Sequence, residues 1–185
     1  YWVAQDDEHL SFADVNLRKH RLSDHSYDIA ILGHHISATA EELTSDLMTD
    51  GMFPKFWRRI HDSIELWKTD SFEGFPNTIA EIKASQLMIS AGACAVNCHQ
   101  EIQDDIIFSV STCLTDDEHS LVKAQELRDW CTHTKQDLYQ WIHQHFQTDF
   151  ANMCIADYVT ANTDRHWGNW GILVNPDNEF IAMAP

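Results

Sequence analysis

Residues 161–171, near the C-terminal end of the chain, read ANTDRHWGNWG. This stretch brings an acid, an imidazole, an amide and two glycines together. A helix-like pattern covers residues 149–160 before it, and a short apolar run covers residues 172–174 after it. Rigid scaffolds commonly carry their catalytic side chains on such a loop. We therefore expect the fold to be organised around this loop and the functional site to include it.

The spacing of two polar residues in this loop indicates a specific chemistry. Asp164 is followed, after four residues, by Asn169, and D-x-x-x-x-N is the spacing of a kinase catalytic loop. In that chemistry the aspartate accepts the proton of the attacking hydroxyl, and the asparagine oxygen helps to hold Mg²⁺ on the phosphates. Asn, Asp, Thr and Gly are also ordinary turn residues, so the rest of the chain must supply the other parts of a nucleotide site.

The overall charge restricts the partners of the chain. Its 185 residues include 12 Lys and Arg against 29 Asp and Glu, a net charge of −17, and 44% of them are hydrophobic. That content supports a globular core, as one domain or two small lobes. A strongly negative field repels phosphate backbones and anionic lipid, so we expect neither direct nucleic-acid binding nor membrane association.

The cysteines indicate a reducing compartment. They are five in number, and no two are spaced as C-x-x-C. An odd set without metal-ligand spacing favours free thiols and a cytoplasmic location over disulfides or a zinc site. Paired histidines at 34–35 and at 143 and 145 do not make a metal site either, because helix neighbours one or two apart face different ways.

Strand-like patterns dominate the first part of the chain. We expect strands at residues 1–5, 27–32, 53–60, 64–68, 95–99 and 106–113, and helices at 37–48 and 78–91. The sequence Thr78-x-x-Glu81 has the spacing of a capping box, which would give Glu81 a structural role. A kinase would instead pair such a helix glutamate with a strand lysine such as Lys68, and the pattern leaves both interpretations open.

Helical patterns dominate after Cys113. A second capping-box spacing at residues 115–118 predicts a helix toward Trp130, and further helices are expected at 135–146 and from 148 onward. Runs at 170–174 and 180–183, joined by a turn, predict a β-hairpin after the loop. This change predicts an α+β fold, with a β-rich N-terminal lobe at residues 1–114 and a helical lobe at 115–185.

A local excess of positive charge lies near the first predicted hairpin. Residues 50–60 contain Lys55, Arg58 and Arg59, three of the twelve Lys and Arg. Gly51 would let the backbone approach a phosphate, and a nearby lysine would neutralise it. The alternative is a hairpin whose basic residues face water, and both interpretations stay open.

Four motifs, in order along the chain, resemble those of the HipA-like serine/threonine kinases, and the resemblance extends from about residue 27 to residue 185. The loop at 161–171 is similar to the N-x-D-x-H-x-x-N of that family. Residues 51–55, GMFPK, resemble its nucleotide-covering loop; residues 81–87, EIKASQL, its glutamate-bearing helix; and residues 109–115, SVSTCLT, its last small-lobe strand and hinge.

This resemblance implies a two-lobed kinase fold that uses ATP and Mg²⁺ to phosphorylate serine or threonine of a protein substrate. Asp164 would be the catalytic base, with His166 beside it, and Asn169 would be a Mg²⁺ ligand. Lys68 would contact the α- and β-phosphates, and Glu81 would position Lys68. The remaining ATP-binding positions would be Gly51 and Lys55 in the covering loop and Thr112, Cys113 and Leu114 at the adenine, with Thr49 as a candidate autophosphorylation site.

Two departures from the family pattern bear on activity. His166 and Gly168 stand where lysines occur in related kinases, so fewer fixed cations would face the γ-phosphate unless His166 is protonated. The family also carries a second metal-binding aspartate shortly after Ala184-Pro185, where this sequence stops. A fragment without that aspartate is expected to bind nucleotide weakly or not to turn over. The alternatives are a catalytically inactive, pseudokinase-type binding or regulatory module and a small-molecule phosphotransferase. An antitoxin or another regulatory partner is also implied by the resemblance.

Overall fold

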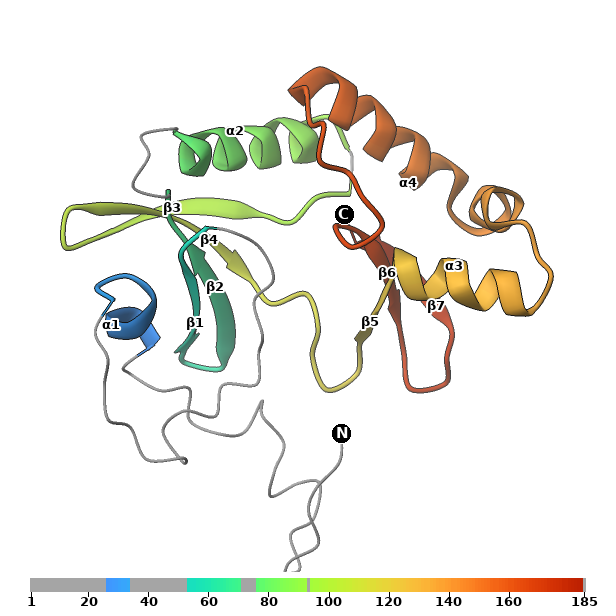
Figure 1. Cartoon of the computed structure of the whole chain (residues 1–185), viewed down its shortest axis with the longest axis horizontal. Helices are drawn as coiled ribbons and strands as arrows, with labels where there is room; N and C mark the ends of the chain where they lie inside the picture. The colour runs from blue at the N-terminus through green and yellow to red at the C-terminus, as the bar shows by residue number, and fades with distance from the viewer. Residues whose placement is uncertain (1–25, 34–52, 71–75, 93, 185) are drawn as a thin grey trace, which may run out of the picture.

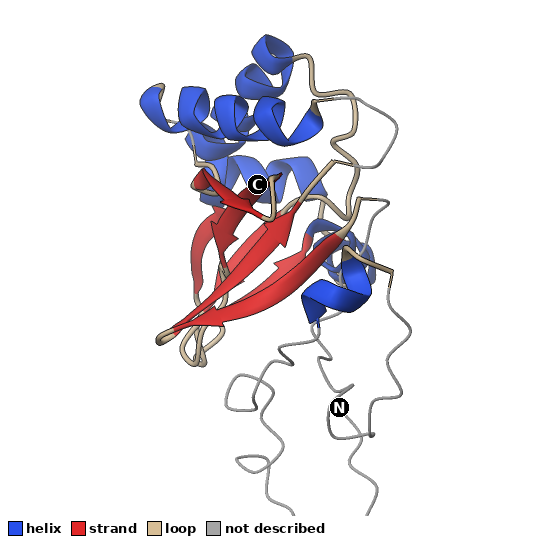
Figure 2. Ribbon diagram, turned by 90° about the vertical axis from the view of Figure 1, so that its left-hand side faces the viewer, coloured by secondary structure: helices blue, strands red, loops and turns tan. Residues whose placement is uncertain are grey.

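The computed structural model describes residues 26–33, 53–70, 76–92 and 94–184 (Figure 1). This part of the chain is α+β, with a four-stranded antiparallel sheet in the order β1-β2-β4-β3 and a three-stranded antiparallel sheet in the order β5-β6-β7. In the view of Figure 2, most of the helical chain lies above the strands. The helix expected at 37–48, the strand expected at 1–5, and Thr49 and Gly51 lie outside the described residues.

The first sheet comprises β1 (Lys55–Ile60), β2 (Ser63–Lys68), β3 (Cys98–Gln103) and β4 (Ile106–Thr112). Each of its strands was expected, but β3 begins three residues later than predicted. The Ser85 hydroxyl, from the neighbouring helix, donates to the carbonyl of Val96 at 2.6 Å and accepts from the N–H of Cys98 at 2.9 Å. Residues just before Cys98 are therefore held by a helix and not by strand β4.

One face of this sheet carries an aromatic core. Phe56, Trp67, Phe108 and Val110 are buried there. The segment expected as a strand at 27–32 is instead helix α1 (Ser26–Ala30), so that prediction was wrong. Residues 27, 30 and 31 have helical spacing, and their side chains pack together on the core.

The opposite face lies under helix α2 (Asn77–Ser90), and three serines are buried between the sheet and this helix beside the apolar Ile82 and Cys98. Ser109 and Ser111 of β4 are 2% and 8% exposed, and Ser85 of α2 is 6% exposed. Figure 1 shows α2 lying along the sheet on the side away from α1. The sheet thus has an aromatic core on one face, and buried serines on the other face lie beside the helix that carries Glu81.

The second sheet is built from β5 (Ser120–Lys123), β6 (Gly171–Val174) and β7 (Phe180–Ala184). The hairpin of β6 and β7 was predicted; β5 was not, and the helix expected from 115 to 130 was wrong in its first half. The carboxylate of Asp116 accepts from the N–H of Glu118 at 2.8 Å and contacts the His119 ring at 2.8 Å, which closes a turn there. Helix α3 (Ala124–His133) begins only after β5, where the Glu126 carboxylate accepts from the N–H of Lys123.

Helix α4 (Leu138–Thr160) merges the two helices expected at 135–146 and after 148. The expected break survives as a kink, because Phe146 has a non-helical backbone with φ −141°. Phe146 is nonetheless buried with Trp141, Ile142 and Met153 against the second sheet. None of the helices in the described ranges is long and apolar enough to cross a lipid bilayer.

Gly171, at the start of β6, is expected to be sensitive to substitution. A Cβ atom added there would overlap the carbonyl oxygen of Val122 and lie 3.0 Å from Leu121 Cδ1. Gly171→Ala should therefore lower the free energy of unfolding by about 1–3 kcal/mol, the cost of overpacking a filled site. Urea denaturation measures this, with the exposed Ser120→Ala in the same sheet as control. A Gly171→Ala protein as stable as the control would mean that β5 does not pack on β6 as described.

Candidate active site

The loop at 161–170 connects the end of α4 to β6, and its residues divide into two sets by burial. Ala161 has φ 53° and ends the helix in the left-handed region. Trp170 is buried, and Arg165 and Trp167 are half-buried, whereas Asp164, His166 and Asn169 are exposed. Hydrogen bonds from the N–H of Ala124 to Trp170 O and from the N–H of Gln125 to Trp167 O tie the loop to α3. The groups expected to do chemistry thus lie on the solvent side of an anchored loop.

Asp164 and Asn169, which the spacing predicts to act together, are in contact. The amide Nδ2 of Asn169 donates to the backbone carbonyl of Asp164 at 2.6 Å and to its carboxylate at 3.3 Å. The N–H of Asp164 donates to the side chain of Asn162 at 3.1 Å. Both bonds of the Asn169 side chain use its nitrogen, so neither of them occupies its oxygen.

His166 is held in one orientation by the loop itself. Its Nδ1 accepts a hydrogen bond from the N–H of Gly168 at 3.0 Å. A ring that accepts at Nδ1 has its other nitrogen, Nε2, available to donate. A Cβ atom at residue 168 would lie 2.9 Å from the ring carbon Cε1. The absence of a Cβ atom at Gly168 therefore leaves room for this position of the imidazole.

Lys68 and Glu81, which lie 13 positions apart, form an ion pair. Lys68 Nζ donates to Glu81 Oε1 at 2.7 Å, and the two side chains are 33% and 36% exposed. The capping-box interpretation of Glu81 is wrong, because the residue before α2 is Pro76, which makes no side-chain cap. Burial raises the pKa of the nearby Cys98 thiol, and the Glu81 charge adds to the effect, so that cysteine stays protonated beneath the pair.

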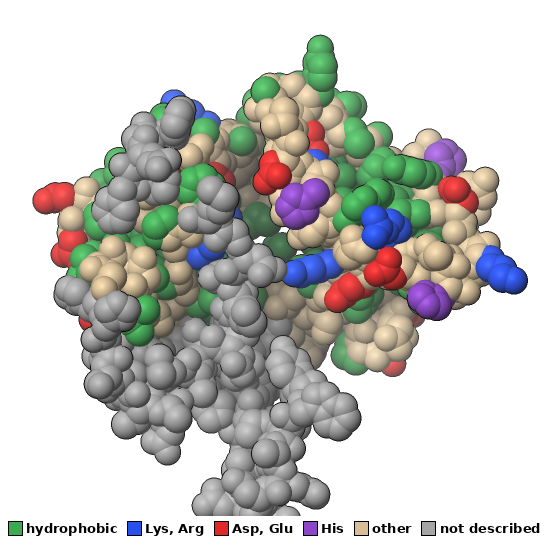
Figure 3. Space-filling view, in the orientation of Figure 1, with side chains coloured by type: hydrophobic (Ala, Val, Ile, Leu, Met, Phe, Trp, Pro, Cys, Tyr) green, Lys and Arg blue, Asp and Glu red, His purple; other side chains and the backbone are tan. Residues whose placement is uncertain are grey.

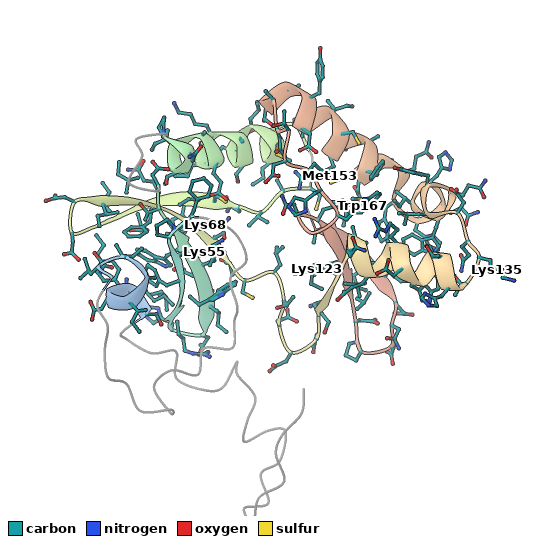
Figure 4. The ribbon with its side chains drawn as sticks, viewed as in Figure 1. Lys55, Lys68, Lys123, Lys135, Met153 and Trp167 are labelled. Atoms are coloured by element: carbon teal, nitrogen blue, oxygen red, sulfur yellow. The ribbon has the colours of Figure 1, made fainter. Side chains whose placement is uncertain are left out.

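Lys55 extends the cationic side of this sheet. It stands directly opposite Lys68 in the pairing of β1 with β2, and directly opposed residues point to the same face. Figure 4 shows both lysine labels close together on the first sheet. Of the three cations noticed in residues 50–60, Arg58 lies on the other face: its guanidinium stacks over Trp67 and donates to Gln103 Oε1.

Asp70 fixes the start of α2. One oxygen of its carboxylate accepts from the N–H of Thr78 at 2.7 Å and from the Thr78 hydroxyl at 2.9 Å. Thr78 is only 4% exposed. The sequence did not indicate this cap, because Asp70 lies outside the window of residues that normally cap a helix.

Loss of this cap is expected to be measurable. Asp70→Ala should lower the free energy of unfolding by about 0.5–2 kcal/mol, the usual cost of removing an N-terminal cap. Asp70→Asn keeps one acceptor oxygen and should lose less. Denaturant titration of the three proteins measures the order, and an Asp70→Ala protein as stable as the unaltered one would show that the carboxylate does not cap α2.

The residues expected to form the adenine hinge lie at the end of β4 and directly after it. Only some of their backbone groups are available to an adenine. The N–H of Cys113 donates to the carbonyl of Ile64 at 2.7 Å and thus extends the sheet by one bond. Thr112 still pairs with Glu65 in the ladder. Leu114, with its side chain 38% exposed, comes next. The Cys113 carbonyl and the backbone of Leu114 are therefore the groups that an adenine could meet.

The two groups of candidate residues lie on facing parts of the molecule. In Figure 4 the labels of Lys55 and Lys68 stand on the first sheet, and that of Trp167, within the loop, stands across the middle of the molecule. The surface in Figure 3 is hollowed between these parts, with Lys or Arg and His side chains at its rim. This arrangement suits a nucleotide whose phosphates lie between the lysines and the loop.

The donor set of the loop suits magnesium better than zinc. Among the residues that the structure describes, no three His, Cys, Asp or Glu side chains gather as a metal site. Mg²⁺ in phosphate-transfer sites takes one or two protein oxygens and completes its shell with water and phosphate. The Asp164 carboxylate and the Asn169 amide oxygen fit that requirement.

Solved structures support a kinase-like fold. The Helicobacter pylori proinflammatory kinase CtkA is similar to this chain, with a TM-score of 0.59 and 19% identity over 75% of the chain. The chain spans about half of that structure's length, 53%. At this identity the likeness shows the fold alone. No curated protein matches the chain.

The family comparison covers more of the sequence. A model described as phosphatidylinositol 3- and 4-kinase matches residues 36–183. The kinase-like α+β fold expected from the sequence is thereby confirmed, and the match also supports the coarser assignment to a kinase family. The relationship to HipA gains no support from this match. Because the match includes both the loop at 161–171 and the Lys68–Glu81 pair, the chain belongs to the phosphatidylinositol 3- and 4-kinase family.

Proposed function

We propose that this chain binds Mg²⁺ and ATP and transfers the γ-phosphoryl group to a hydroxyl. The observation that carries the proposal is the Lys68–Glu81 ion pair at 2.7 Å, on the sheet that faces the D-x-x-x-x-N loop. A lysine paired with a helix glutamate and an aspartate with a metal-binding asparagine are the two parts that phosphoryl transfer requires. Family membership supports the same reaction class.

Each candidate residue has a role that its contacts support. The exposed Asp164 carboxylate would accept the proton of the attacking hydroxyl, and Asn169 and Asp164 would offer oxygens to Mg²⁺, which neutralises charge on the phosphates. Lys68 would bind the phosphates while Glu81 holds it in place. His166, whose Nδ1 is held by the N–H of Gly168, would donate a hydrogen bond from Nε2 toward the transferred group.

Two further groups complete the nucleotide site in this proposal. Lys55, opposite Lys68, would add a second positive charge beside the phosphates. The Cys113 carbonyl and the backbone of Leu114, directly after β4, would contact the adenine. We also propose residues 1–114 and 115–185 as the two lobes; the two separate sheets and their separate hydrophobic clusters support this division.

The acceptor is proposed to be a serine or threonine hydroxyl of a protein, as in the HipA-like kinases that the loop resembles. Thr49 would be a site of autophosphorylation, and a regulatory partner of the antitoxin kind would fit the same resemblance. The second candidate is the inositol ring of a phosphatidylinositol, which the name of the matching family favours. Both acceptors present a hydroxyl to the same base.

One experiment tests the reaction and the acceptor together. The purified protein is incubated with Mg²⁺ and γ-³²P-labelled ATP, once with casein and once with vesicles containing phosphatidylinositol. Label in the protein band supports the first acceptor, and label in the organic extract supports the second. Mass spectrometry locates any phosphate on Thr49. No transfer to either acceptor or to the protein itself, with nucleotide binding intact, would establish the inactive binding module instead.

A further inference from the structure

Asp157, in the last turn of α4, accepts hydrogen bonds from several residues of the loop at 161–170. Its carboxylate accepts from Arg165 Nε at 2.9 Å and Arg165 Nη2 at 2.8 Å, a two-point contact between planar groups. The same carboxylate accepts from Asn162 Nδ2 at 2.8 Å. Its backbone carbonyl accepts from the N–H of Asn162 at 2.9 Å. One side chain thus holds two loop residues.

Both residues held by Asp157 also form a hydrogen bond to one of the candidate reacting residues, Asp164 or Asn169. Asn162 accepts, through Oδ1, from the N–H of Asp164 at 3.1 Å. Arg165 donates, through Nη1, to the backbone carbonyl of Asn169 at 3.0 Å. The candidate base and the candidate metal ligand are therefore each one bond away from a residue that Asp157 holds.

We infer that Asp157 is a positioning residue, which acts through Arg165 and Asn162 to set the distance between Asp164 and Asn169. The inference rests on the proposed phosphoryl transfer. A base and a metal ligand must be held within a fraction of an ångström to be effective. Asp164, His166 and Asn169 are exposed and cannot be held by packing, so hydrogen bonds to a fixed helix must do so.

The burial of the pair makes this network stronger than an ordinary surface ion pair. The side chains of Arg165 and Asp157 are 20% and 14% exposed. A two-point arginine–carboxylate contact in such surroundings gives direction as well as attraction. Burial alone would raise the pKa of Asp157, but the bonds from Arg165 and Asn162 and the Arg165 charge outweigh it, and the pKa lies below its usual 3.8.

The lowered pKa of Asp157 sets the pH range in which this network is charged. A carboxyl whose folded-state pKa is depressed adds stability above its unfolded-state pKa and loses it as the pH falls through the lower, folded-state value. Asp157 is therefore fully charged at neutral pH, and titration of this group should not shape a kinase pH profile between pH 6 and 8.

The test compares Asp157→Asn, which keeps the shape and removes the charge, with Asp149→Asn, which removes the same charge from the same helix. In Asp157→Asn, kcat should fall about tenfold, in line with the loss of one charge-assisted hydrogen bond. The KM for ATP should stay unchanged, because Lys68 lies on β2, Glu81 lies on α2 and residues 113–114 follow β4, and none of them belongs to the loop. Asp149→Asn should retain kcat.

A second measurement does not depend on activity. Hydrogen exchange of amides at 162–169 should speed up about tenfold in Asp157→Asn, because the loop loses a charged anchor. Amides of β1, β2 and β4 should not change. Faster loop exchange with unaltered kcat, or unaltered loop exchange, overturns the inference. Absence of phosphoryl transfer in the unaltered protein would refute the proposed function, while hydrogen exchange would still decide whether Asp157 holds the loop.

Discussion

Replacing Asp164 by asparagine is expected to lower kcat about 10²- to 10⁴-fold, the contribution that a positioned general base makes. Asparagine keeps the size of the side chain but cannot accept the proton of the attacking hydroxyl. The bonds that hold the loop should survive, because Asn169 and His166 both bind the backbone carbonyl of residue 164. A phosphate-transfer assay at saturating ATP measures the effect.

The control for this variant is Asp177→Asn. Asp177 is an exposed residue of the turn between β6 and β7, so the substitution changes the net charge equally without reaching the loop. Its kcat should equal that of the unaltered protein. An Asp164→Asn enzyme as active as this control would assign the proton transfer to another group, of which His166 is the nearest candidate.

Lys68→Met is expected to lower kcat/KM for ATP about 10²- to 10³-fold, the loss seen when one preorganised donor to a developing charge is removed. Methionine occupies a volume similar to that of lysine but has no ammonium group. Glu81→Gln should lose less, because the amide oxygen can still accept from Lys68. Steady-state kinetics over a range of ATP concentrations measures both.

Lys83→Met is the matched control, because Lys83 is exposed on α2, two residues from Glu81. It should leave the kinetics unaltered. Equal losses in Lys68→Met and Lys83→Met would show that overall charge, and not the Lys68–Glu81 pair, governs nucleotide binding. A Lys68→Met enzyme with an unaltered kcat/KM for ATP would show that the first sheet is not part of the nucleotide site.

Short-range patterns predicted the parts of the site that are close in sequence. The contact between Asp164 and Asn169 follows from their spacing within one turn, and the β6–β7 hairpin follows from its turn residues. The Lys68–Glu81 contact joins two elements, and sequence reasoning reached it only through family resemblance. The alternative interpretation, a capping box between Thr78 and Glu81, is wrong because the N–H of Thr78 donates to Asp70 and not to Glu81.

Contacts between distant segments explain the errors. Residues 27–32 have strand-like composition, but as a helix they pack Tyr27, Ala30 and Ile31 against the aromatic face of the first sheet, and this packing overrides the local preference. Residues 120–123 became a strand because β6, almost fifty positions later, pairs with them. The Asp157–Arg165 ion pair was not predicted either, because no sequence pattern connects two residues that lie eight positions apart across the end of a helix.

In the proposed site ATP places its phosphates beside Lys68, and a reactive nucleotide tests this directly. An acyl-phosphate derivative of ATP transfers its acyl group to the lysine amine nearest its phosphates, and mass spectrometry identifies the modified residue. We predict labelling of Lys68, or of Lys55 opposite it, that excess ATP abolishes, and no ATP-sensitive labelling of the exposed Lys83 or Lys135. Labelling that spares Lys68 and Lys55, or that ATP does not prevent, would contradict the proposed site.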